Sequence, residues 1–196
     1  MHSFDLFPTK LWVGKLDIDE TIILDKLTKW FDNGGNVLHD NRSMSAKGDG
    51  FNCDELSEVI KENIPRPEGM DVPETYIHYW ANFNPPGAFN HRHHHTDTVI
   101  LLSGVYYLKV PPNSGRITFF DPRGLTINSM GDSRFYKFEP EVSMDPQPGM
   151  IVYFPSWLEH EVETNQGESE RISIAFNIVS KYELDRYKSM EDSLVS

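Results

Sequence analysis

The sequence predicts a mainly β protein in which helices near the N-terminus pack on a β-sandwich or barrel. From Glu74 onward, short runs rich in aromatic and β-branched residues are separated by Gly, Pro and Asn, as in strands joined by turns. Before that point, two segments repeat apolar residues at helical spacing. The 196 residues, 38% of them hydrophobic, fit a single domain over residues 1–196.

The first elements are expected to be a strand and a helix. Residues 10–16 combine apolar and β-branched residues in a strand-like run. A helix is expected over residues 18–33, because Asp17 and Glu20 resemble a capping box and two glycines follow the helical repeat.

A polar segment and a second helix come next. Residues 36–51 contain few apolar residues and are expected to form a loop. The helix is expected over residues 53–64, with Asn52 as its N-cap and Pro65 directly after it. We therefore expect residues 1–70 to pack on the β core as cover for one sheet, without supplying a catalytic group.

The β core is expected to occupy residues 74–180. Its strand-like segments end in turn residues such as Pro85 to Gly87, and a short helix is expected to follow the last strand. The expected strands lie within residues 74–83, 98–110, 116–124, 133–142, 148–156 and 171–180.

Charge and composition exclude several classes of partner. A formal net charge of −12 disfavours nucleic acids and anionic membranes, which both need a basic surface. The single cysteine, Cys53, cannot form an internal disulfide and favours a reducing compartment. No apolar run approaches the roughly 20 residues of a membrane span, and the first residues lack a signal-peptide core, so a cytoplasmic location is expected. Exposed strand edges favour a homodimer.

A histidine-rich stretch, NHRHHHTD at residues 90–97, suggests a metal site. If His95 and Asp97 lie on one strand, their side chains point to the same face, and His160 from a neighbouring strand can complete a set of three ligands. Two His and one carboxylate form the facial triad of non-haem Fe(II) oxygenases, whose open positions accept a 2-oxo acid and O₂. No catalytic group beyond the metal ligands is expected.

A second group of residues suits a 2-oxo diacid. Arg171 offers a guanidinium that binds a carboxylate through two hydrogen bonds and stays charged when buried. Ser173 lies on the same face of the strand and offers a hydroxyl. Tyr107 follows Asp97 at an even spacing, which keeps it on the metal-facing side of the next strand. Trp80, Phe154 and Trp157 are candidate pocket walls, but all three are also compatible with the core, Phe154 more so than the other two.

The order His-x-Asp, His and Arg-x-Ser resembles that of the Fe(II)/2-oxoglutarate-dependent dioxygenases. More specifically, a branch of these oxygenases found in bacteria and their phages is similar to the segments WANFNPPGAFNHRHHH, LSGVYYLKVPPNSGRITFFDPRG, GMIVYFPSWLEHEV and RISIAFNI. The resemblance covers about residues 74–180. It implies a double-stranded β-helix, or jelly roll, and a cofactor set of Fe(II), 2-oxoglutarate and O₂, and it favours a hydroxylase acting on an unknown small molecule or peptide.

Alternatives remain open at two levels. Many relatives carry His-x-His, so His93 and His95 compete with His95 and Asp97 for the metal. We favour Asp97, because the spacing from Asp97 to Ser103 then needs no insertion within a strand, and because a carboxylate lowers the net charge of an Fe(II) site. In this interpretation His91, His93 and His94 belong to a loop before His95. A cupin-like isomerase or dioxygenase, or a non-catalytic metal-binding module, could share the fold but would not turn over 2-oxoglutarate.

Overall fold

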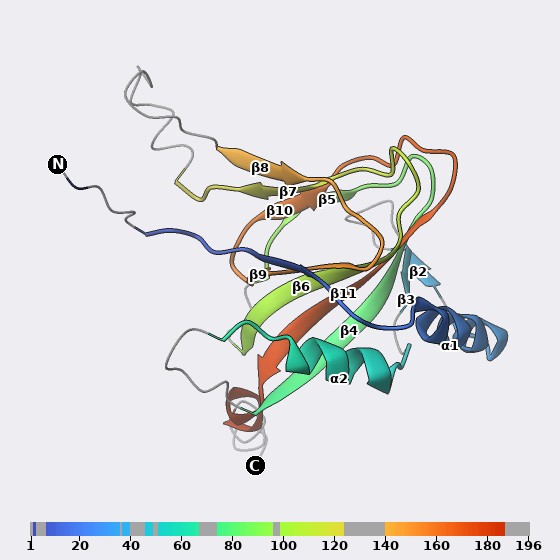
Figure 1. Cartoon of the computed structure of the whole chain (residues 1–196), viewed down its shortest axis with the longest axis horizontal. Coiled ribbons are helices and arrows are strands. Elements are labelled where there is room, and N and C mark those ends of the chain that lie inside the picture. Colours follow the sequence, from blue (N-terminus) through green and yellow to red (C-terminus); the bar gives the residue numbers. More distant parts are fainter. Residues whose placement is uncertain are drawn as a thin grey trace, which may run out of the picture.

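The computed structural model describes residue 2 and residues 7–35, 37–39, 46–48, 51–66, 74–95, 99–123 and 140–186. Its strands form a seven-stranded sheet and a four-stranded sheet, and the helices lie outside the larger one (Figure 1). The larger sheet has the order β1-β9-β6-β11-β4-β3-β2, and the smaller sheet has the order β5-β10-β7-β8.

The core strands follow the jelly-roll arrangement that the resemblance implied. The chain crosses repeatedly between the two sheets, and every strand pair in the core is antiparallel. Most successive core strands therefore lie in opposite sheets, and the two sheets face one another. The strands are β4 (Thr75–Asn84), β5 (Asn90–His93), β6 (Ile100–Lys109), β7 (Ile117–Phe120), β8 (Glu141–Met144), β9 (Met150–Pro155), β10 (His160–Val162) and β11 (Arg171–Ser180).

N-terminal elements extend the larger sheet at both edges and cover its outer face. Strand β1 (Trp12–Lys15) pairs with β9, whereas β2 (Val37–His39) and β3 (Ala46–Gly48) continue the sheet beyond β4. Helices α1 (Glu20–Asp32) and α2 (Asp54–Glu62) bury Ile23 and Leu56 completely. These helices are amphipathic, and the sheet supplies the apolar surface that their hydrophobic faces need.

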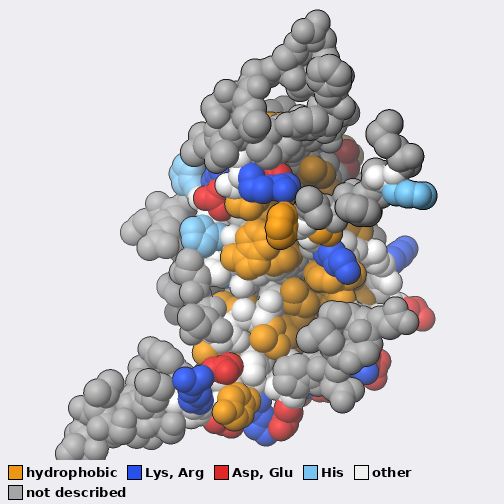
Figure 2. Space-filling view, turned by 90° about the vertical axis from the view of Figure 1, so that its left-hand side faces the viewer, with side chains coloured by type: hydrophobic (Ala, Val, Ile, Leu, Met, Phe, Trp, Pro, Cys, Tyr) orange, Lys and Arg blue, Asp and Glu red, His pale blue; other side chains and the backbone are white. Residues whose placement is uncertain are grey.

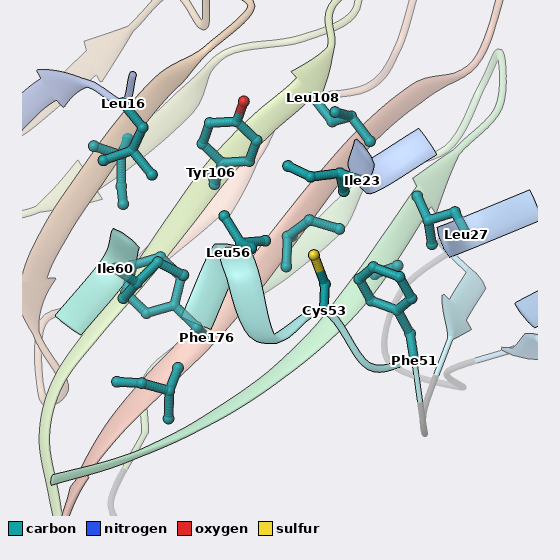
Figure 3. Close-up of a cluster of buried hydrophobic side chains, with 14 of the residues drawn as sticks. Leu16, Ile23, Leu27, Phe51, Cys53, Leu56, Ile60, Tyr106, Leu108 and Phe176 are labelled. Atoms are coloured by element: carbon teal, nitrogen blue, oxygen red, sulfur yellow. The ribbon is translucent and has the colours of Figure 1, made fainter. Parts of the chain in front are cut away.

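The main core lies between these helices and the outer face of the larger sheet. Figure 3 shows Ile23 and Leu56 from the helices pointing toward Tyr106 and Phe176 of β6 and β11. All four side chains are fully buried. The N-terminal elements thus stabilise the sheet from the side opposite to the smaller sheet, as expected for residues that cover it.

A second, smaller core lies between the two sheets. Val105, Val152 and Phe154 of the larger sheet pack with Ile117 and Phe119 of β7.

Seen from the side that carries β8, hydrophobic side chains gather in the middle of the surface, with charged side chains around them and His side chains at the margins (Figure 2).

Three local expectations were wrong. Helix α1 starts two residues later than expected, because the Asp19 carboxylate accepts a hydrogen bond from the Thr21 backbone N–H at 3.0 Å and acts as the N-cap. The N-cap of α2 is Cys53 rather than Asn52, whose side chain accepts a hydrogen bond from the Tyr79 hydroxyl instead. The expected loop at residues 36–51 contains β2 and β3.

The remaining strand expectations agree with the structure within a few residues, and residues 181–186 form the expected short helix. Most of the strand expected at residues 133–142 lies outside the described residues. No helix within the described ranges combines the length and the apolar character needed to cross a membrane.

Candidate active site

The inner face of the larger sheet lines a pocket of about 620 Å³ between the two sheets. Alternate residues of β11 point into it, because side chains alternate along a strand. Arg171, Ser173 and Asn177 therefore form a row, and each lies opposite a polar residue of β4 or β6 in the strand register. The row runs from Arg171 at one end of the pocket to Asn177 at the other.

Arg171 is 1% exposed and carries a partly unused guanidinium. Its Nη1 donates hydrogen bonds to the backbone oxygens of Ser114 at 2.9 Å and Gly115 at 3.1 Å. Its Nε has no hydrogen-bond partner among the described residues. Burial lowers the pKa of Arg171, yet arginine stays protonated in proteins, so this positive charge and its unused donor suit an anionic ligand.

The loop before β7 holds the carbonyl groups that fix Arg171. Gly115 has a φ of +89°, and a Cβ there would lie 2.3 Å from the Glu163 backbone oxygen, so only glycine fits. Arg116 pairs with the Glu163 carboxylate at 2.7 Å and joins this loop to the segment after β10. The orientation of the Arg171 guanidinium is therefore set by backbone that is itself held in place.

Further polar groups surround the Arg171 end of the pocket. Ser173 and Tyr107 are cross-strand partners, and both line the pocket, as expected from the sequence. Burial raises the pKa of Tyr107 to about 12, so its hydroxyl remains a hydrogen-bond donor at neutral pH. Asn84, opposite Arg171, donates from Nδ2 to Asn90 Oδ1 at 3.1 Å, whereas its buried Oδ1 has no partner among the described residues.

Three histidines gather on the opposite wall, where they form a candidate metal site. One ligand atom from each of His93, His95 and His160 lies within 4.8 Å of the others. The ring centroids of His93 and His160 are 4.3 Å apart, and that of His95 lies 5.5 Å and 5.4 Å from them. His160 is buried, His95 is half-buried and His93 is exposed, so one side of the group remains open to incoming ligands.

Each of the three rings is oriented by a hydrogen bond at its Nδ1 atom. His93 Nδ1 donates to the His91 backbone oxygen at 2.6 Å, and His160 Nδ1 donates to the Leu158 backbone oxygen at 2.9 Å. His95 Nδ1 lies 2.6 Å from Ser103 Oγ. A carbonyl oxygen can only accept, so at least His93 and His160 carry their proton on Nδ1, which leaves Nε2 as the nitrogen that can bind a metal.

The buried position of His160 keeps its imidazole neutral. Burial, followed by the positive charge that neighbouring His93 can carry, lowers the pKa of His160 to about 3. Only the neutral imidazole has a lone pair for a metal ion, so His160 is ready to bind without losing a proton.

Strand pairing brings His93 to this position. His93 lies opposite His160 in the register of β5 and β10, and the register shifts by one residue between this pair and Asn90–Val162. Such bulges occur beside functional sites and redirect a side chain. Arg92 is ion-paired with Glu159 and lies 3.9 Å above the Phe120 ring, which fixes β5 against its neighbours.

The structure places the residues expected from the sequence as follows. His95 lies between β5 and β6, not at the start of a strand, and its backbone N–H donates to the Ser156 oxygen at 2.8 Å. His91 and His93, expected in a loop, belong to β5. Asp97 lies outside the described residues, so its role as a ligand stays a prediction.

Two of the three aromatic residues expected as pocket walls line the pocket. Trp80 and Phe154 line the pocket, whereas Trp157 is about half exposed and is not part of the lining. No side chain from the described part of residues 1–50 belongs to the histidine group or to the pocket lining. The absence of a catalytic group from the N-terminal elements stays a prediction.

The donor set fits a divalent transition metal, and the Arg171 end fits a carboxylate. Imidazole suits Zn, Cu, Fe and Ni, and a buried guanidinium with an unused N–H needs an anion. A family model described as "Putative 2OG-Fe(II) oxygenase" matches residues 78–177, which cover about half of the chain and contain both groups. The chain belongs to this family of 2OG-Fe(II) oxygenases.

Solved structures of other oxygenases have a similar fold. A prolyl-4-hydroxylase from Pseudomonas putida is 17% identical, with a TM-score of 0.56 over 88% of this chain and 94% of that one. A prolyl hydroxylase from Trichoplax adhaerens, solved with a peptide fragment of hypoxia inducible factor, is 16% identical, with a TM-score of 0.61 over 88% and 84%.

A third similar structure was solved with ligands bound. HygX from Streptomyces hygroscopicus, solved with nickel, 2-oxoglutarate and hygromycin B, is 9% identical, with a TM-score of 0.57 over 89% of this chain and 84% of that one. No curated protein sequence matches the chain. At these identities the structures establish the jelly-roll fold of the oxygenase, and the family establishes it as an enzyme.

Sequence reasoning missed several polar residues of this oxygenase site. Asn177 continues the alternation of Arg171 and Ser173, so the spacing along β11 contained a signal for it. Ser103 belongs to the Ser-Gly pair used only to judge the spacing of the histidines. Asn84 and Asn90 approach one another through the turn between β4 and β5, which the sequence did not indicate.

Proposed function

We propose that the protein is an Fe(II)- and 2-oxoglutarate-dependent hydroxylase. The observation that carries the proposal is one pocket with a histidine group on one wall and the buried, partly unused Arg171 on the other. His95 and His160 would hold Fe(II). The distal carboxylate of 2-oxoglutarate would bind the edge of Arg171 formed by Nε and Nη2, with Ser173 and Tyr107 donating their hydroxyl groups to it.

The identity of the third metal ligand separates two versions of the site. The geometry supports His93, because its ring lies against that of His160 and its Nδ1 is held by a backbone oxygen. The His-x-Asp order predicts Asp97. We propose His93 as the third ligand in the described arrangement, and variants of both residues test the choice.

When bound, Fe(II) and 2-oxoglutarate supply the oxidation, in which one atom of O₂ enters succinate with release of CO₂ and the other becomes a hydroxyl group on the substrate. The chain positions the reactants. Arg171 and its neighbours orient 2-oxoglutarate, and Val105, Ile117 and Phe154 give the pocket apolar walls that exclude water. His78 and Trp80 lie at the end away from Arg171, where they would contact a small-molecule or peptide substrate.

A non-catalytic metal-binding protein or a cupin-like enzyme could use the same histidines. Cupins commonly present more His ligands, and the three-histidine geometry gives this reading some support. Neither alternative explains a buried arginine with an unused donor in the same pocket. Homodimer formation and a cytoplasmic location stay predictions from the sequence.

Turnover of 2-oxoglutarate tests the proposal. Protein loaded with Fe(II) is mixed with 2-oxoglutarate in air, and succinate is measured with and without the metal, using His160→Ala as a matched control. An oxygenase forms succinate slowly even without its substrate, and only with Fe(II) and an intact His160. Absence of succinate from protein that has bound Fe(II) would refute the proposed function.

A further inference from the structure

A buried polar pair behind His95 has no role in the function proposed so far. Ser103 of β6 is fully buried and Asn177 of β11 is 8% exposed, and the two are direct partners in the strand register. Burying a hydroxyl and an amide is costly unless both are hydrogen-bonded, and an apolar pair would pack equally well in a sheet. Their presence therefore points to a task other than packing.

The two side chains form a chain of hydrogen bonds that ends on His95. Ser103 Oγ donates to Asn177 Oδ1 at 2.8 Å, and His95 Nδ1 lies 2.6 Å from the same Ser103 Oγ. A serine hydroxyl has a single proton. Because that proton is used toward Asn177, the oxygen accepts from His95, and His95 must carry its own proton on Nδ1.

The sheet holds this chain of hydrogen bonds rigidly. Gly104, next to Ser103, is covered by the Phe176 ring of β11, because an added Cβ would lie 2.2 Å from that ring, so the backbone beside Ser103 is closely packed. His95 itself lies outside any strand, between β5 and β6. Ser103, which belongs to the sheet, therefore helps to fix the ring of His95, whose own backbone lies outside any strand.

We propose that Ser103 and Asn177 are positioning residues that fix the tautomer and orientation of His95, so that Nε2 is directed to the metal. This inference rests on the proposed function, because it requires His95 to bind a metal. Asn177 lies opposite His78 in the strand register, and its link to His95 runs through the Ser103 hydroxyl that it orients. Without Asn177 as acceptor, that hydroxyl is free to donate to His95 Nδ1, which would favour the tautomer whose Nε2 carries the proton and cannot coordinate.

Cobalt(II) affinity tests the proposal without relying on turnover. The Kd for Co(II) is measured by visible absorption for the wild type, Ser103→Ala, Asn177→Leu and Asn177→Asp. Loss of a group that orients a metal-binding histidine typically weakens binding about 10- to 100-fold, and this is expected for Ser103→Ala and Asn177→Leu. Asn177→Asp keeps an acceptor for Ser103 and should stay close to the wild-type value.

A double variant and a matched control sharpen the result. Once the hydroxyl is absent, Asn177 has nothing to orient, so Ser103→Ala combined with Asn177→Leu should bind Co(II) no more weakly than Ser103→Ala alone. Ser143→Ala removes a comparable hydroxyl pair, with Thr118 at 2.9 Å, that contacts no histidine, and should leave the Kd unchanged.

Each other outcome overturns part of the account. If the wild type binds Co(II) and all variants bind it equally, the positioning role is wrong and the proposed function stands. If Asn177→Asp, which keeps both the size and the acceptor oxygen, is weakened as much as Asn177→Leu, the acceptor for Ser103 is not what matters, and the proposal fails. If the wild type itself binds no Co(II), the proposed function and this inference fail together.

Discussion

Replacing Arg171 tests how the pocket recognises its cosubstrate. Arg171→Lys keeps a positive charge but loses the planar fork of donors, whereas Arg171→Met removes the charge and keeps much of the side-chain volume. Both variants leave the histidine group untouched. The account therefore predicts weaker binding of 2-oxoglutarate with no change in metal affinity.

The expected magnitude follows from the contacts of the guanidinium. Nη1 is already bonded to two backbone oxygens, whereas Nε and Nη2 donate to no group among the described residues, so a ligand can bind at that edge of the guanidinium. A hydrogen bond to a charged group contributes about 1.5–3 kcal/mol. Since about 1.4 kcal/mol corresponds to a tenfold change, Arg171→Met should raise the Kd for 2-oxoglutarate roughly 10- to 100-fold, and Arg171→Lys should lie near the lower end.

Calorimetry on the Mn(II)-loaded protein without O₂ measures this Kd directly. Arg123→Met is the matched control, because the exposed Arg123 pairs with Asp121 after β7 and is not part of the pocket lining. It should leave the Kd unchanged, and thermal unfolding checks that every variant is folded. Unchanged 2-oxoglutarate binding in folded Arg171→Met, or an equal loss in Arg123→Met, would refute the assignment of Arg171.

Three further predictions concern the metal site and the fold. His93→Ala should weaken Mn(II) binding measured by calorimetry, whereas a strong loss in Asp97→Ala with little effect of His93→Ala would show that the third ligand is Asp97. The pKa of His160 is about 3 in the folded protein and near 6.5 in the unfolded chain. Between these two pH values only the unfolded chain binds a proton at His160. The metal-free protein therefore loses stability as the pH falls below about 6.5. Denaturation at pH 7 and pH 5 should differ by about 2 kcal/mol more in the wild type than in His160→Gln, and equal differences would contradict a buried neutral imidazole. Leu56→Ala should lower the free energy of unfolding by about 2–5 kcal/mol while the Kd for 2-oxoglutarate stays unchanged, and a change in that Kd would show that helix α2 affects the pocket.

Sequence patterns predicted the parts of the site that depend on alternation along one strand. Arg171 and Ser173 share the inner face of β11, and Tyr107 faces them from β6, because an unbroken strand keeps every second residue on one side. The jelly-roll core was predicted from the resemblance of residues 74–180 to Fe(II)/2-oxoglutarate-dependent dioxygenases, and the family match confirms this resemblance.

The histidine stretch was harder to interpret, because its geometry depends on pairing between distant segments. The position of His93 is set by its pairing with His160 and by the register shift within β5. Neither can be derived from local spacing, since a shift of one residue turns a side chain to the other face. The hydrogen bonds from Ser103 to Asn177 and from Asn84 to Asn90 likewise join residues that only the folded sheets bring together.

A crystal structure with Mn(II) and N-oxalylglycine, an inert mimic of 2-oxoglutarate, would show the metal site and the cosubstrate pocket together. We expect Mn(II) bonded to Nε2 of His95 and of His160, with the mimic bound to the metal at one end and its distal carboxylate at the Nε and Nη2 edge of Arg171. It also reveals whether His93 or Asp97 completes the site. Mn(II) bound away from these histidines, or a mimic whose distal carboxylate does not reach Arg171, would contradict the account.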